Sequence, residues 1–263
     1  MTTRVTQKSS PWWAAPNGIE IASIVVFLAA WELLGKMFNP VLFAPPSRVL
    51  LSYPDLVASG ELGSAIRTTL VAMFVGYVGA AVVGILFGLL WGRSPFIQDV
   101  IEPFINALYA IPRVALVPLV IVWFGIGFAG RVFIVFYGTV FDVMINTCTG
   151  VRYTEKALLE VGRSFGATER QLFRHIILPY SVPYVMAGLR LGIGRALVGV
   201  IVAEMFLQMT GMGGLILTFG ETYRIASMLS VVVLLSGLGV LLTWVVKKAE
   251  RMAAPWKTFN TQS

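Results

Sequence analysis

Long apolar stretches alternate with short polar segments along the chain. The segment from Thr68 to Gly92 has 25 residues without Asp, Glu, Lys or Arg, and the segment from Ile225 to Val246 has 22. A helix needs about 20 apolar residues to cross a hydrocarbon core, and lipid leaves an open backbone no other way to pair its polar groups. The pattern therefore predicts an all-α membrane protein.

Six transmembrane helices are predicted within a single transmembrane domain at 19–247, between an N-terminal segment at 1–18 and a C-terminal tail at 248–263. The helices cover about residues 19–38, 68–92, 100–124, 132–151, 179–206 and 225–246. Prolines at 103, 112 and 118 predict a kink or break in the third helix. Glycines at 76, 79, 84 and 88 make the second helix a candidate for close packing, because small residues let helix backbones approach in lipid.

Composition agrees, since 57% of the 263 residues are hydrophobic and 13% are charged, against about 25% charged in soluble domains. The net charge of +7 is explained by the loops on one side of the membrane rather than by nucleic acid. If the N-terminus is cytoplasmic, that side receives twelve Lys and Arg residues and the other side five. Both termini and the loop at 152–178 are therefore predicted to be cytoplasmic.

That loop predicts a helix, a turn and a second helix. Thr154 can cap a helix over Glu155 to Arg163, and Gly166 suits the left-handed conformation at a helix end. Thr168 and Gln171 match a capping box that opens a second helix, which Leu178-Pro179 is expected to end as the fifth span begins. The loop has apolar residues to spare: Leu158, Leu159, Val161, Phe165, Leu172, Phe173 and Ile176.

Three interpretations of this loop compete. A DNA-binding helix-turn-helix is disfavoured, because both ends of the loop enter the membrane at once. An amphipathic loop lying on lipid headgroups remains open. Docking onto a soluble subunit is favoured, because of a sequence signature.

The loop resembles the cytoplasmic signature of the membrane-spanning permease subunits of binding-protein-dependent ABC importers. That signature reads Glu-Ala-Ala, three residues, Gly, nine residues, Ile, one residue, Leu-Pro. At this spacing the chain has Glu160, Gly166, Ile176, Leu178 and Pro179, and it departs at the two alanines, which are Val161 and Gly162. The stretches FAPPSRVL, YAIPRVALVPLVIVWFGIG, LRLGIGRALVGVIVAEM and GMGGLI look like the branch that imports nitrate, bicarbonate, sulfonates and taurine.

The resemblance implies a type I importer permease whose loop is the coupling helix, resting on an ATP-hydrolysing subunit. Glu160 would anchor the loop, Gly166 would permit its turn, and Leu178-Pro179 would transmit motion into the fifth span. The implied coupling residues are Glu160, Val161, Gly162, Gly166, Ala167, Ile176, Leu178 and Pro179. The implied partners are a second copy of the permease, two ATP-binding subunits and an external binding protein, in the lipid bilayer of a bacterial inner membrane. The solute would be a small anion.

Five ionisable residues within the predicted spans are candidates for the translocation path: Arg113, Asp142, Arg190, Arg195 and Glu204. Charges inside a membrane are costly, so they either pair with one another or line a polar path, and both interpretations remain open. Arg190 lies about 16 Å from Pro179 along the fifth helix, near mid-membrane. Arg195 lies about 140° around that helix, so the two arginines cannot share a face.

No residues predict catalysis, a bound cofactor or a metal in this chain. It lacks a Gly-rich phosphate loop ending in Lys-Ser/Thr, so ATP and Mg²⁺ are expected on a separate subunit. His175 is the only histidine and Cys148 the only cysteine. An ion-coupled secondary transporter is the alternative, disfavoured because Asp142 is its only candidate ion-binding acid, and a membrane enzyme is less favoured still. Trp12, Trp13, Trp244 and Trp256 are expected at the membrane interfaces.

Overall fold

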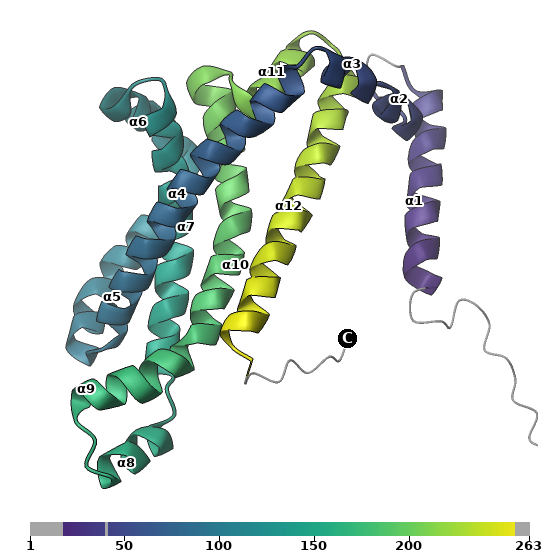
Figure 1. Cartoon of the computed structure of the whole chain (residues 1–263). Helices are drawn as coiled ribbons and strands as arrows, with labels where there is room; N and C mark the ends of the chain where they lie inside the picture. Colours follow the sequence, from purple (N-terminus) through teal and green to yellow (C-terminus); the bar gives the residue numbers. More distant parts are fainter. Residues whose placement is uncertain (1–17, 40–41, 256–263) are drawn as a thin grey trace, which may run out of the picture.

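The computed structural model describes residues 18–39 and 42–255, which form helices joined by short segments (Figure 1). The long helices are α1 (Gly18–Met37), α4 (Glu61–Gly92), α7 (Phe128–Arg152), α10 (Leu178–Ala203) and α12 (Ile225–Ala253). The shorter helices are α2 (Pro46–Leu51), α3 (Tyr53–Ala58), α5 (Pro95–Ala110), η2 (Arg113–Leu116), α6 (Val117–Phe124), α8 (Lys156–Ser164), α9 (Glu169–Leu172), η3 (Phe173–Ile177), η4 (Glu204–Gln208) and α11 (Gly211–Glu221).

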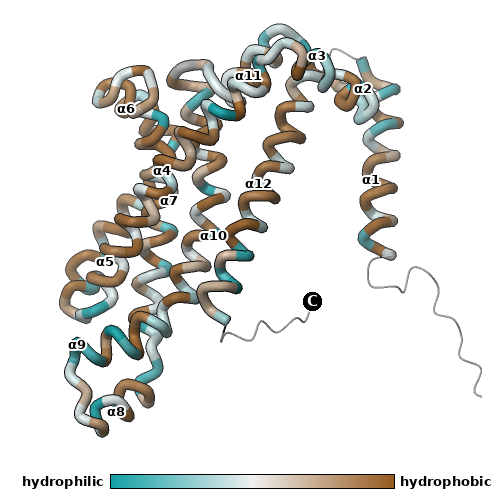
Figure 2. The backbone as a smooth tube through the Cα atoms, in the orientation of Figure 1, coloured by the Kyte–Doolittle hydropathy of each residue, from teal (hydrophilic) through white to brown (hydrophobic). Residues whose placement is uncertain are grey.

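Six segments of the described chain are long and apolar enough to cross a membrane. Five are single helices, and the sixth combines α5 with η2 and α6, which meet at a bend of 86°. Pro112 precedes η2 in an extended conformation, so the break predicted for the third span is confirmed. Figure 2 shows much of α1, α4 and α12 in the brown of hydrophobic residues, and teal hydrophilic residues in α9.

Glycines allow α4 and α7 to pack backbone against backbone. A Cβ atom built on Gly84 or Gly88 would lie 2.9 Å or 2.6 Å from a carbonyl oxygen of α7, and one on Gly76 would lie 2.7 Å from the Val135 Cβ. The close packing predicted for these three glycines is confirmed. Gly79 differs, because its Cβ would make only an ordinary contact, 3.6 Å from the Phe136 ring.

Helix α7 lies at the centre of the bundle and packs against both α4 and α10. Its residue Val135 is fully buried with Ala72 and Met73 of α4 and with Ala196 and Val200 of α10. Helix α11 was not expected from the sequence, because its eleven residues include four glycines, a composition typical of loops. Its glycines serve close packing instead: a Cβ on Gly213 would lie 2.6 Å from the Ile201 carbonyl oxygen.

Helix α1 stands apart from the bundle and reaches it through α2 and α3 (Figure 1). Glu32, one of the two acids in this span, accepts hydrogen bonds from the Ser47 amide at 3.0 Å and from its hydroxyl at 2.8 Å. Lys36 lies 2.9 Å from the same carboxylate. These contacts tie the end of α1 to the start of α2.

Several observed helix ends differ from the predicted boundaries. Helix α4 begins at Glu61, before the predicted 68, and α12 continues to Ala253, past the predicted 246. The extension of α12 carries Glu250, which is buried against the bundle, so a tertiary contact stabilises the helix beyond its uncharged apolar run. Trp244 lies exposed on α12, whereas Trp12, Trp13 and Trp256 and most of the predicted terminal segments lie outside the described residues.

Candidate functional site

The loop between α7 and α10 folds as two short helices joined by a tight turn. Helix α8 ends at Ser164, and Gly166 adopts a positive φ of 74°. The Thr168 side chain then accepts a hydrogen bond from the Gln171 amide while the Gln171 side chain accepts one from the Thr168 amide, so the predicted capping box is confirmed. Together α8, the turn and α9 are called the α8–α9 unit (156–172) below.

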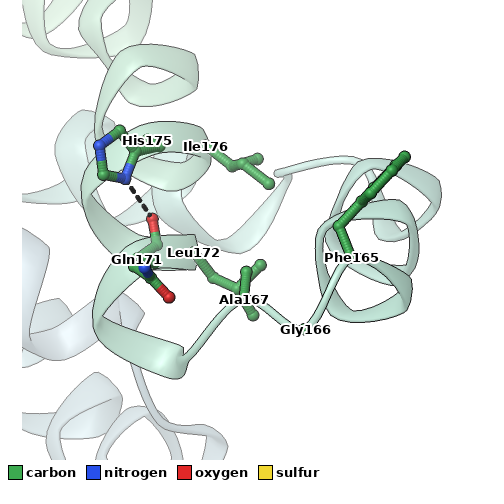
Figure 3. A pocket seen from close by; sticks show the side chains of 7 residues that line it. All are labelled: Phe165, Gly166, Ala167, Gln171, Leu172, His175 and Ile176. Carbon is green, nitrogen blue, oxygen red and sulfur yellow. Dashed lines mark hydrogen bonds between the residues drawn. The ribbon is translucent and has the colours of Figure 1, made fainter.

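Gly162 is the point where α8 meets the second arm of the loop, which consists of α9 and η3 (169–177). A Cβ built on Gly162 would lie 2.5 Å from Leu172 Cδ2 and 2.9 Å from Ile176 Cδ1. Leu172 is buried, and Figure 3 shows it and Ile176 pointing toward the helix that precedes Phe165. The glycine that replaces a signature alanine therefore receives the apolar side chains of the facing helix.

Several apolar side chains of the α8–α9 unit remain uncovered. Phe165 is 87% exposed, and Leu158 and Val161 are also exposed. A hollow of about 280 Å³ lies beside them, with Phe165, Gly166, Ala167, Gln171, Leu172, His175 and Ile176 around it. His175 turns away from α8 and donates a hydrogen bond from Nδ1 to the Gln171 carbonyl oxygen at 3.0 Å (Figure 3). Exposed apolar groups around a hollow suit contact with another protein surface.

Two expectations for this loop are wrong. Thr154 does not cap α8, since its buried hydroxyl donates to the Gly150 carbonyl oxygen at 3.4 Å and Glu155 is the first residue before the helix. Leu178-Pro179 does not end the second helix, since one continuous helix runs from Glu169 to Leu207. Proline would clash with a regular helical turn before it, and the chain relieves this by widening residues 173–177 into the π-helical turn η3.

The predicted coupling residues divide between the two arms. Glu160, Val161 and Gly162 lie on α8, with the first two exposed. Gly166 and Ala167 form the turn, and Ile176, Leu178 and Pro179 lie where the second arm becomes α10. That arm is continuous with the spanning helix α10.

The α8–α9 unit lies at the end of the molecule where α1 begins and α12 ends (Figure 1). The Arg93 guanidinium, after the last residue of α4, lies 5.7 Å from the centre of the Phe173 ring. The second arm of the loop therefore also contacts the junction between α4 and α5.

Three of the five candidate path residues come together in the structure. Arg195 Nε on α10 lies 3.6 Å from Asp142 Oδ2 on α7, and Tyr109 donates a hydrogen bond to Asp142 Oδ1 at 3.1 Å. Arg113, in η2 at the bend, donates to the Arg195 carbonyl oxygen at 3.4 Å. This group is called the Arg113–Arg195 cluster below.

The other two candidates lie in separate ion pairs. Arg190 Nη1 is 2.8 Å from Glu250 Oε2 on α12. Glu204 is fully buried, accepts hydrogen bonds from the Thr69 hydroxyl at 2.8 Å and the Gly213 amide at 3.0 Å, and lies 3.8 Å from Arg131 Nη1. Pairing therefore accounts for Arg190 and Glu204.

Sequence reasoning missed both partners of these pairs. The hydrophobic pattern predicts Glu250 in the C-terminal tail and Arg131 in a loop, because both stand outside the longest uncharged runs. The one signal that could have revealed these partners is that the neighbouring spans can continue as helices to include Arg131 and Glu250.

Comparisons with known proteins agree with this architecture. Residues 84–252 match the family described as binding-protein-dependent transport system inner membrane component. The aliphatic sulfonates transport permease protein SsuC of Escherichia coli is 30% identical over 93% of this chain and 90% of its own length. The nitrate import permease protein NrtB of Synechocystis is 28% identical over 89% of this chain and 88% of its own length.

Solved structures show the same fold. The inward-facing MetNI methionine ABC transporter superposes with a TM-score of 0.59 at 21% identity, covering 77% of this chain and 99% of the matched one. An amino acid ABC transporter superposes with a TM-score of 0.59 at 17% identity, covering 77% and 96%. The chain therefore belongs to the family of binding-protein-dependent transport system inner membrane components, as a multi-pass permease subunit of an ABC importer.

Proposed function

We propose that the α8–α9 unit is the surface through which a separate ATPase drives this permease. The observation that carries the proposal is the exposure of Phe165, Val161 and Leu158 on a unit that the bundle leaves uncovered. Because the second arm runs into α10 without a break, force applied by an ATPase would reach the membrane interior through backbone hydrogen bonds. Glu160, exposed on α8, is available for a polar contact with that partner.

The working assembly would hold two copies of this chain, two ATP-binding subunits and one external binding protein. One chain supplies six spans and a single coupling unit, so two ATPase subunits require two permeases. The excess of Lys and Arg on the side of the α8–α9 unit supports a cytoplasmic position for it and for both termini. In this assignment ATP and Mg²⁺ bind the partner subunits, and this chain is not itself an enzyme.

The solute would be a small molecule with an anionic oxygen group. Relatives along most of this chain are named for aliphatic sulfonates, taurine and nitrate. Sulfonate and nitrate are planar or pyramidal oxyanions that suit guanidinium donors, and the bundle carries arginines inside its spans. Bicarbonate and organic acids share this chemistry.

Reconstitution tests the proposal. Proteoliposomes with the permease, its ATPase and its binding protein should accumulate labelled taurine, methanesulfonate or nitrate only when ATP is supplied. A proton or sodium gradient without ATP should drive none. Accumulation driven by the gradient alone would favour the secondary-transporter alternative and contradict the proposal.

A further inference from the structure

The Arg113–Arg195 cluster lies where the spans contain both charge and irregular backbone. The chain bends by 86° between α5 and η2–α6, and Arg113 is the first residue of η2. Asp142 lies in the middle of α7, and Arg195 lies well inside α10. Three helices thus bring their intramembrane charges to one place.

The position of these side chains suits an aqueous space better than lipid. The Arg195 side chain is 52% exposed, and Arg113 is partly exposed. Neither a guanidinium nor a non-helical backbone is tolerated against lipid tails, although both are tolerated where they line a water-filled cavity. This face of α10 and the bend therefore suit the wall of a polar space within the membrane.

The cluster carries one more positive charge than negative. Asp142 is its only carboxylate among the contacts given above, and it faces Arg195 and Tyr109. Arg195 Nε stands 3.6 Å from that carboxylate, beyond hydrogen-bond distance, so the guanidinium keeps donors to spare. Arg113 contacts a neutral carbonyl group and lies over Gly138, where a Cβ would come within 3.0 Å of its Nη1.

Two other arginines inside the spans differ. Arg190 makes a close pair with buried Glu250, and Arg131 is buried beside Glu204 and donates to the Thr210 hydroxyl at 3.1 Å. Each of these guanidinium groups has its own carboxylate, so neither offers an unbalanced charge. Only the Arg113–Arg195 cluster, among the ion pairs within the described spans, combines exposure with a surplus cation.

We propose that Arg113 and Arg195 form a binding site for a small oxyanion inside the membrane. The inference rests on the proposed import of an anionic solute. It assigns that solute a binding site along the translocation path. The two guanidinium groups donate hydrogen bonds to the oxygen atoms of a sulfonate, nitrate or carboxylate group. Asp142 positions Arg195 and, by its own charge, weakens anion binding enough for release.

Binding can be measured without transport. The purified permease–ATPase complex is titrated with sodium methanesulfonate or sodium nitrate against sodium gluconate at equal ionic strength, and its thermal unfolding temperature is followed. Wild type should rise saturably by about 3 °C or more. Arg113→Gln should lose this rise, and Arg113→Lys should recover part of it because the charge returns. Arg152→Gln is the matched control, since it breaks an exposed pair with Glu102 at the end of α7 and should respond like wild type.

The Asp142→Asn variant separates binding from folding. Removing the competing carboxylate should lower the anion concentration for half-maximal effect by several-fold, whereas a purely structural Asp142 would give no such gain. An absent rise in wild type, or equal rises in wild type and Arg113→Gln, would overturn the site. ATP-driven uptake that persists unchanged in Arg113→Gln would overturn the site and leave the proposed function intact, while wild type without ATP-driven uptake would overturn the function itself.

Discussion

Glycine and apolar residues have opposite roles in two regions of the molecule. One region is the interface between α4 and α7, and the other is the α8–α9 unit. In the interface, Gly84 and Gly88 bring α7 within contact of the α4 backbone, and the apolar residues around them are buried. In the unit, Gly166 has nothing within 4 Å of its missing Cβ, and its neighbour Phe165 is 87% exposed. The same residue type serves close approach in one region and a left-handed turn in the other.

The difference separates what holds the permease together from what the permease offers to a partner. A region that buries its own apolar surface depends on contacts within the chain and is sensitive to added volume. A region that leaves apolar surface bare on a rigid support depends on the shape of its backbone. Substitutions of glycine distinguish these two requirements.

The largest effect is expected at the α4–α7 interface. Gly88→Ala should destabilise the folded permease by about 1–3 kcal/mol or more, because its Cβ would press on the Met144 carbonyl oxygen, which cannot move independently. Gly79→Ala in the same helix is the matched control and should be neutral, since its Cβ meets only the Phe136 ring at 3.6 Å. Unfolding in detergent measures both. Equal losses in the two variants would show that the interface is not closely packed.

A loss of coupling with intact folding is expected at Gly166. Gly166→Pro should abolish ATP-driven uptake, because proline fixes φ near −65° and the turn needs +74°. The amount of folded permease in the membrane should stay unchanged. Gly166→Asn should retain most activity, since asparagine tolerates the left-handed conformation. Full uptake by the proline variant would contradict the importance of this turn.

The smallest effect is expected at Gly162. Gly162→Ala restores the alanine of the family signature, and its Cβ would meet the terminal methyl groups of Leu172 and Ile176. Those side-chain ends can rotate away, so uptake should stay within about twofold of wild type. A loss of tenfold or more would mean that α8 and α9 are locked as tightly as α4 and α7.

Much of the fold follows from the sequence. The six spans and the proline break are encoded in hydrophobic length and in proline's missing amide, both of which act locally. The close packing of Gly76, Gly84 and Gly88 follows from residue size at helical spacing. The Thr168–Gln171 capping box is also a local interaction, and it forms as predicted.

What the sequence did not reveal depends on tertiary contacts. The helix α12 extends to its last turns because Glu250 meets Arg190, sixty residues away. The second arm of the loop stays continuous through Pro179 because the π-helical turn before it accommodates the proline ring. No local sequence pattern predicts this π-helical turn. The sequence identifies the candidate path residues as individual charges. Which of them form one cluster and which form two separate pairs depends on how the helices pack, and this is visible only in the structure. Their role in transport remains a prediction.

Retention of the ATPase subunit by two matched variants of the tagged permease tests the central claim most directly. Phe165 is 87% exposed on the α8–α9 unit, and Met252 is 76% exposed at the same end of the molecule on α12. If the unit is the docking surface, Phe165→Ala should weaken co-purification of the ATPase by about tenfold or more, as expected for an aromatic anchor, and Met252→Ala should leave it unchanged. Equal retention by wild type and both variants would contradict the account.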